Sequence, residues 1–254
     1  MLTESDIVRY FECGTHRLTV AGGSRVGNRY PANFDVLHVD PALPFVAVAD
    51  GMGAGQGSTV AGTTAMETFV AAVRAAGPSA GAAHLRAAVA TAQTRVRAAG
   101  AQLDELTGCT LTALLVGPTG TDAWITQIGD SRAYRLRNGL LELLTVDHTA
   151  AWLGAVYGWY PADSPQAAAA RYQLARYLGH PDEPEADLLN VSLRPGDVYC
   201  LCTDGVSEPI GYDRLRQLLD GEPANAVRVL LADTLATGGR DNATITVLKV
   251  GAGG

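Results

Sequence analysis

The chain has 254 residues, 47% of them hydrophobic and 18% charged, so it is long enough to bury a full core and favours one domain, 1–254, over two small ones. Its formal net charge of −7 argues against nucleic-acid and membrane-surface partners, which need a basic face. No stretch approaches the roughly 20 apolar residues of a membrane-spanning helix, and residues 1–10 lack the pattern of an export signal. We therefore expect a cytoplasmic protein, in which the cysteines are reduced.

The first segment with a clear pattern is the apolar run 45–49, which stops at Asp50 and continues into a glycine-rich stretch up to Gly57. This pattern predicts a buried strand that enters a loop. Residues 60–76 and 79–96 are rich in alanine, and apolar residues recur at helical spacing, so they predict two helices. The segment before residue 45 shows little periodicity and predicts no element.

From residue 108 onward the pattern changes to strands, with Asn138-Gly139 as a hairpin turn. Segment 150–178 mixes aromatic residues, glycines and an alanine-rich helix, which predicts a surface flap whose aromatic side chains pack within it. Because strands fall into hairpins and helices into separate pairs, we expect an α+β layered fold. The expected elements are strands at 109–116, 124–128, 133–136, 140–145, 198–202 and 243–250, and helices at 213–219 and 224–235.

Several predicted strands run into an aspartate and a tight turn, at Asp50, Asp130 and Asp204, and Asp241 precedes the last strand. Taken singly, an aspartate at a turn is usually only a turn or cap residue. Strands of packed sheets can, however, bring their ends to one rim, where several carboxylates destabilise one another unless cations neutralise them. Oxygen ligands favour magnesium or manganese over zinc, so the pattern predicts a site for such ions.

Two other patterns suggest different chemistry and are disfavoured. The glycines of 51–57 precede a helix, as in a phosphate-binding loop, but no Lys-Ser/Thr pair follows them, and Asp50 would repel the phosphates. Ser131, Asp147 and His148 contain the residue types of a hydrolase triad, but the last two are adjacent in sequence and tend to point apart. We therefore expect His148 to be structural.

The ordered motifs resemble those of one family, the metal-dependent or type 2C serine/threonine protein phosphatases, and in particular its bacterial-type members. The resemblance extends over nearly the whole chain and implies a four-layer αββα sandwich of two antiparallel sheets flanked by helical pairs. The matching motifs are Asn33-Phe-Asp35, Asp50-Gly-Met-Gly53, Gly108-Cys-Thr110, Gly129-Asp-Ser-Arg132 with Tyr134, Thr145-Val-Asp-His148, Cys202-Thr-Asp-Gly205 and Gly239-Arg-Asp-Asn242.

The resemblance implies that the cofactors are two Mg²⁺ or Mn²⁺ ions with a possible third. Asp50 would bridge two ions, the backbone carbonyl of Gly51 would bind one of them, and Asp204 and Asp241 would hold the other. A water activated between the ions would then hydrolyse phosphoserine or phosphothreonine in protein substrates.

Further residues enter through the same resemblance. Asp35 would act through metal-bound water, Asp130 would help to hold the third and weaker ion, and Asn242 would lie behind the ligands. An arginine is expected to clamp the phosphate oxygens bidentately. Arg29 is the preferred candidate and Arg25 its competitor, because Arg29 lies one residue farther from the first acidic motif than is usual in bacterial members.

Two positions depart from the family pattern. Phe34 occupies a position where many members have glutamate, which puts the affinity of one metal ion in doubt. Met52 occupies a position where some eukaryotic members have a histidine proposed as general acid, so protonation of the leaving group would fall to metal-bound water. These departures keep open the alternative of a pseudophosphatase, a binding module without turnover. A dedicated phosphatase of one phosphoserine protein is also open, and the sequence does not indicate the oligomeric state.

Overall fold

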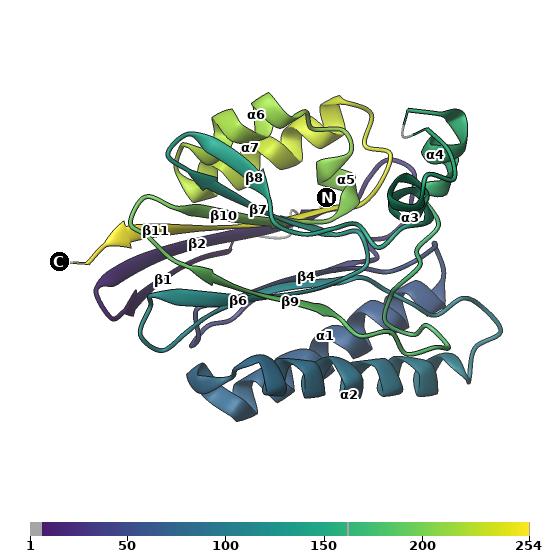
Figure 1. Ribbon diagram of the computed structural model, residues 1–254, viewed down its shortest axis with the longest axis horizontal. Helices are drawn as coiled ribbons and strands as arrows, with labels where there is room; N and C mark the ends of the chain where they lie inside the picture. Colours follow the sequence, from purple (N-terminus) through teal and green to yellow (C-terminus); the bar gives the residue numbers. More distant parts are fainter. Residues whose placement is uncertain (1–6, 162, 254) are drawn as a thin grey trace.

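The structure is a computed structural model that describes residues 7–161 and 163–253. Residues 1–6, which belong to the segment inspected for an export signal, lie outside the described residues. Two β-sheets stack face to face, with one pair of helices on each outer side (Figure 1). Every pair of neighbouring strands is antiparallel. The predicted α+β sandwich of four layers is therefore confirmed.

One sheet has six strands, in the spatial order β1 (Ile7–Cys13), β2 (His16–Arg25), β11 (Ala243–Ala252), β10 (Val198–Cys202), β7 (Arg132–Arg137) and β8 (Leu140–Leu143). The other sheet has five, in the order β3 (Asp35–Val39), β4 (Phe45–Asp50), β5 (Leu111–Val116), β6 (Asp122–Ile128) and β9 (Asp187–Ser192). Asn138 and Gly139, with φ of 52° and 77°, form the predicted tight turn between β7 and β8.

The helices fall into three groups. The five-stranded sheet is covered by α1 (Gln56–Ala76) and α2 (Ala82–Gly100), which a 3₁₀ turn at Gly77–Ser79 connects. The six-stranded sheet is covered by α6 (Tyr212–Leu219) and α7 (Pro223–Ala236), which follow the short helix α5 (Asp204–Ser207). The helices α3 (Ala150–Tyr157) and α4 (Pro165–Ala170) lie at one end of the molecule, as expected of a flap. Within the described ranges, no helix combines the length and apolar character needed to cross a bilayer.

Strand β10 shows why the central strands are apolar on both faces. Its odd-numbered and even-numbered side chains point to opposite sides of the sheet. Cys200 and Cys202 pack against α6 and α7, whereas Tyr199 and Leu201 pack between the two sheets. Since both faces are covered, the strand has the continuous apolar run that the sequence shows.

Four strands were missed in the sequence, namely β1, β2, β3 and β9. Strands β1, β3 and β9 are edge strands that lie partly open to solvent, so their side chains do not alternate cleanly between apolar and polar. Strand β2 carries Gly22 in its second half, where a Cβ would lie 2.8 Å from a methyl group of Val39 in the facing sheet. The segment before residue 45 is therefore not irregular, as the sequence suggested, but contains three strands.

Candidate active site

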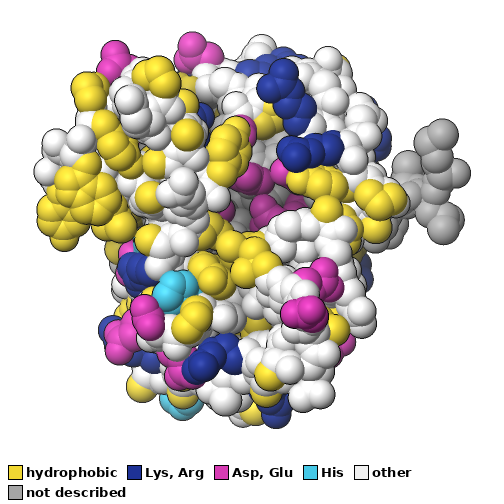
Figure 2. Space-filling view, turned by 90° about the vertical axis from the view of Figure 1, so that its right-hand side faces the viewer, with side chains coloured by type: hydrophobic (Ala, Val, Ile, Leu, Met, Phe, Trp, Pro, Cys, Tyr) yellow, Lys and Arg dark blue, Asp and Glu magenta, His cyan; other side chains and the backbone are white. Residues whose placement is uncertain are grey.

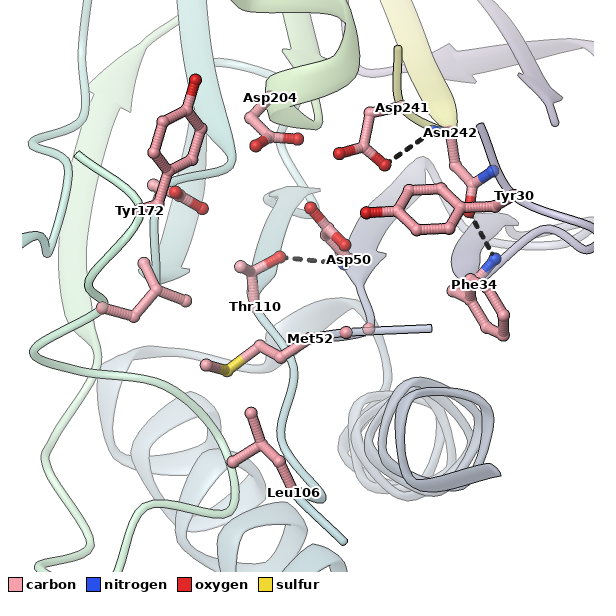
Figure 3. Close-up of a pocket in the computed structure, with 14 residues that line it drawn as sticks. Tyr30, Phe34, Asp50, Met52, Leu106, Thr110, Tyr172, Asp204, Asp241 and Asn242 are labelled. Atoms are coloured by element: carbon pink, nitrogen blue, oxygen red, sulfur yellow. Dashed lines mark hydrogen bonds between the residues drawn. The ribbon is translucent and has the colours of Figure 1, made fainter. Parts of the chain in front are cut away.

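Four of the predicted aspartates line one cavity of about 230 Å³ at an edge of the sandwich. Asp50 ends β4, Asp130 follows β6, Asp204 begins α5 and Asp241 precedes β11. The carboxylates of Asp50, Asp204 and Asp241 point toward a common centre (Figure 3). Seen from outside, acidic side chains lie at the bottom of a hollow with basic side chains above it (Figure 2). Elements of both sheets therefore meet at this cavity.

Backbone contacts place Asp50. Its N–H donates to the hydroxyl of Thr110 at 2.9 Å, and its carbonyl accepts from the Thr110 N–H at 2.9 Å. The Thr110 hydroxyl also lies 2.7 Å from that of Ser131, which is fully buried. Thr110 was part of a sequence motif but had no predicted role; a bond between residues sixty positions apart leaves no local signal.

Two glycines permit the close approach of the segments that carry the aspartates. A Cβ at Gly51 would lie 2.5 Å from the Ser58 carbonyl oxygen, and one at Gly205 would lie 1.8 Å from the carbonyl oxygen of Asn242. No side chain fits either distance. Gly205 therefore lets the start of α5 lie against the residues before β11, which brings Asp204 beside Asp241.

Asp35 lies behind the cavity wall. The register of β3 and β4 sets it opposite Asp50, and its side chain is buried, with Oδ2 accepting a 2.8 Å hydrogen bond from the hydroxyl of Thr203. It is not among the residues that line the cavity. Asp35 would reach an ion in the cavity through a bridging molecule, as the predicted role through water assumes.

Asn242 holds the segment that precedes Asp35. Its side-chain oxygen accepts from the N–H of Phe34 at 2.8 Å, and its amide nitrogen donates to the carbonyl of Ala32 at 3.2 Å. The Phe34 ring is buried and packs edge-on against Tyr30, with ring centroids 5.9 Å apart. Phe34 is thus a packing residue that also lines the cavity.

His148 is a structural residue that supports the turn at Gly129, just before Asp130. Its Nδ1 accepts from the N–H of Gly129 at 3.1 Å, and its N–H donates to the Gly129 carbonyl at 2.9 Å. Its Nε2 faces Asp187 and Arg176, at 3.1 and 2.9 Å. None of the hydrogen bonds of the described residues joins His148 to Ser131, and Asp147 pairs with Arg132. The triad interpretation is therefore not supported.

Burial and mutual repulsion shape the charge of the carboxylates. Burial raises the pKa of Asp35 to about 7, although hydrogen bonds from Thr244 and Thr203 act to lower it. Burial and the nearby charge of Asp241 raise the pKa of Asp204 to about 6. The pKa values of Asp50 and Asp130 are also well above the usual value, because of burial first and then the charge of Asp204. The cluster thus favours protons or cations as counter-charge.

The donor set fits divalent cations. Within the described residues, Asp204 Oδ1 is buried without a hydrogen-bond partner, which leaves it available as a ligand. Among residues 7–161 and 163–253, no three acidic, histidine or cysteine side chains form a ready-made cage. Mg²⁺ does not need one, because it is usually held by one or two carboxylates and keeps several waters.

A second cavity of about 430 Å³ adjoins the first. Tyr172, Asp204 and Asp241 line both cavities, and Arg29 lines the second. The guanidinium of Arg29 lies 5.2 Å from the centre of the Tyr30 ring. Arg25, at the end of β2, lies opposite Ala243 of β11 and lines neither of these two cavities.

The flap contributes one wall of the site. Tyr172, which is 70% exposed, lines both cavities, and its ring stands at the cavity edge opposite Tyr30 (Figure 3). The aromatic cluster 152–160, expected to pack within the flap, does so in part: Tyr157 and Trp159 stack with centroids 5.6 Å apart, yet both remain exposed. Tyr172 was missed because no motif or periodicity marks it.

Comparisons with known proteins agree with this geometry. The chain is 34% identical over 145 residues to the serine/threonine protein phosphatase PstP of Mycobacterium tuberculosis, a match covering 56% of this chain but only 27% of that relative. A crystal structure of the phosphatase MsPP from Mycobacterium smegmatis, in complex with cacodylate, superposes with a TM-score of 0.79 at 30% identity, covering 91% of this chain and 98% of the other.

The catalytic domain of PstP in complex with two manganese ions superposes with a TM-score of 0.76 at 32% identity, covering 92% of this chain and 98% of that one. The model of the protein phosphatase 2C family matches residues 33–243, which include all the aspartates described above. The chain therefore belongs to the protein phosphatase 2C family.

Proposed function

We propose that the chain is a divalent-metal-dependent phosphatase that hydrolyses phosphoserine and phosphothreonine in proteins, with residues 1–254 acting as one catalytic domain. The observation that carries this proposal is the gathering of Asp50, Asp130, Asp204 and Asp241 around one cavity, with an unpartnered carboxylate oxygen on Asp204. Buried carboxylates in this arrangement are unstable without counter-cations.

In this proposal Asp50 and the carbonyl of Gly51 would hold one ion, and Asp50 would share a second ion with Asp204 and Asp241. Asp35 would support the site through a water, and Asp130 would help to hold a third ion. When bound, Mg²⁺ or Mn²⁺ supplies the charge that neutralises a phosphomonoester dianion and activates a water for attack. The relative PstP, which was crystallised with two manganese ions, supports this cofactor class.

The chain's own residues then orient the substrate. Arg29 binds the phosphate oxygens from the second cavity, where its planar fork can reach two of them. Met52 lines the first cavity and cannot donate a proton, so protonation of the leaving oxygen falls to water. Tyr172 and Tyr30 border the entrance and exclude part of the solvent.

The test is hydrolysis of p-nitrophenyl phosphate and of a phosphothreonine peptide in EDTA, Mg²⁺ or Mn²⁺. Wild type should turn over only with a divalent ion, and Asp204→Asn should lose nearly all activity. Asp220→Asn, an exposed aspartate after α6, is the matched control and should behave like wild type. If the folded wild type hydrolyses neither substrate with any ion, the pseudophosphatase alternative, which Phe34 keeps open, becomes the better interpretation.

A further inference from the structure

Two loops from distant parts of the chain are joined beside the metal site. The N–H of Asn28 donates to the carbonyl of Gly239 at 2.6 Å, and its side-chain amide donates to the carbonyl of Gly238 at 3.1 Å. Gly238 and Gly239 have φ of 122° and 57°, which other residues rarely adopt. A Cβ at Gly27 would lie 2.1 Å from the carbonyl oxygen of Asp241. The junction is therefore built from close backbone contacts.

This junction places two arginines at one cavity. Arg29 follows Asn28, Arg240 follows Gly239, and both line the second cavity of about 430 Å³. Among the described residues, neither guanidinium has an ion-pair or hydrogen-bond partner. The guanidinium of Arg29 lies over the ring of Tyr30. Two guanidinium groups without a hydrogen-bonded partner are therefore available at one cavity, where each can bind an anion.

Arg29 acts on the charge of one cavity carboxylate. Burial raises the pKa of Asp241, while the N–H of Asn242 and the charge of Arg29 act in the opposite direction. Arg29 therefore acts electrostatically on Asp241, and its role as the phosphate clamp stays part of the proposed function. Arg240 is exposed, stands next to Asp241 in sequence and, like Arg29, lines the second cavity but not the first. It is left without a role in the proposed hydrolysis.

We propose that Arg240 determines specificity: with the second cavity, it binds an anionic side chain that flanks the phosphorylated residue of the substrate. This inference rests on the proposed phosphatase function. The guanidinium fork suits a carboxylate or a second phosphate. The second cavity shares Tyr172, Asp204 and Asp241 with the first, so a residue that flanks the phosphorylated one has a neighbouring cavity to enter.

Glu208 is the competing charge in the same cavity. The pKa of Asp204 is raised first by burial, then by the charge of Asp241 and then by that of Glu208. The exposed carboxylate of Glu208 therefore acts on the first cavity as well. Once cations neutralise Asp204 and Asp241, two arginines face one glutamate, and the balance favours an anion. A basic flank is the alternative occupant and forms one arm of the test.

The experiment compares phosphothreonine peptides that carry aspartate, alanine, lysine or phosphoserine at the positions flanking the phosphothreonine. For wild type, we expect the KM of the best acidic peptide to be about fivefold lower than that of the alanine peptide, as for one exposed charge pair. Arg240→Gln should remove this preference and leave kcat and the hydrolysis of p-nitrophenyl phosphate within about twofold. Arg95→Gln, which makes the same charge change on α2, should keep the preference.

Separate outcomes would overturn the inference. Equal KM values for acidic and neutral peptides with wild type, or a preference for lysine, would show that the cavity does not select anions. An equal loss on p-nitrophenyl phosphate in Arg240→Gln would place Arg240 in the phosphate clamp instead. If wild type hydrolyses no substrate, the proposed function has failed, and the affinities of the same peptides for wild type, measured by fluorescence anisotropy, still decide whether acidic flanks bind better and need Arg240.

Discussion

The hydroxyl and backbone N–H of Thr110 hold Asp50 in place through the Asp50 backbone, so these contacts do not occupy its carboxylate. Thr110 binds both its N–H and its carbonyl, and the strand register sets it opposite Asp35. Such an arrangement orients a carboxylate without neutralising it. A substitution that keeps the shape of Asp50 but removes its charge should therefore change cation binding more than folding.

We expect Asp50→Asn to abolish turnover, with kcat/KM lowered at least about 1,000-fold, because one charge would hold both cations in the proposed site. Calorimetric titration with Mn²⁺ should show the loss of the tightest binding. An Asp50→Asn enzyme that retains substantial activity would rule out the bridging role. Asp220→Asn serves again as the control for loss of a carboxylate.

The arginine clamp can be tested by the contrast between two residues. Arg29→Ala should raise the KM for p-nitrophenyl phosphate about 10- to 100-fold with a smaller effect on kcat, since a charge-assisted hydrogen bond is worth about 1.5–3 kcal/mol. Arg25→Ala, on a strand end away from both cavities, should change KM less than about twofold. The reverse result would make Arg25 the clamp.

At the scale of elements, the connection between β3 and β4 depends on one buried carboxylate. Asp40 Oδ1 accepts from the N–H groups of Ala42 and Leu43, each at 2.9 Å, while Oδ2 accepts from Arg74 of α1 at 2.7 Å and lies 3.2 Å from His38 Nε2. Burial alone would raise the pKa of Asp40, but these hydrogen bonds outweigh it and lower the pKa to about 2. The charged carboxylate therefore stabilises the hairpin and ties it to the helix layer.

Asp40→Asn should destabilise the protein by about 2 kcal/mol at pH 7, because the unfolded carboxyl titrates near 3.9 and the folded one near the value above. A lowered pKa means that this contribution is complete above about pH 5 and disappears as the pH falls toward 2. Urea unfolding at pH 7 and pH 3 should show the difference shrinking to about half. A constant difference would contradict the charge argument, and Asp182→Asn, whose carboxylate is 88% exposed, should have little effect.

Some strands and site residues could be predicted from the sequence, and others could not. Central strands such as β4 and β10 are covered on both faces, so their apolar runs were recognisable, and the turn at Asn138-Gly139 was chemically marked. Edge strand β9 has no such signal, since its pairing with β6 depends on residues sixty positions away. Likewise, the four aspartates at strand ends could be predicted to gather, whereas Thr110 and Tyr172 could not, because tertiary contacts alone bring them to the site.

At the scale of the molecule, the acidic cavity makes the stability of the metal-free protein depend on pH. The raised pKa values of Asp35 and Asp204, about 7 and about 6, mean that the folded state holds protons that the unfolded state releases near pH 4. Stability should therefore fall as the pH rises from 4 through 7, by on the order of a few kcal/mol.

Thermal unfolding in EDTA should thus give a lower Tm at pH 7.5 than at pH 5.5, and Mn²⁺ should reverse this trend by binding only the folded state. Asp50→Asn removes one of the repelling charges, so in EDTA at pH 7.5 it should be more stable than wild type and gain less from Mn²⁺. A Tm in EDTA that is flat or rises between these pH values would contradict the repulsion argument.

Strand β11 contains the last residues of the fold to be synthesised, yet it lies in the interior of its sheet, between β2 and β10, and Asp241 and Asn242 immediately precede it. A chain emerging from the ribosome exposes its N-terminal residues first. Until residues 243–252 have left the exit tunnel, the sheet has a gap, and no strand holds Asp241 and Asn242 at the acidic cavity. Translation products that stop short of β11 should therefore show no phosphatase activity.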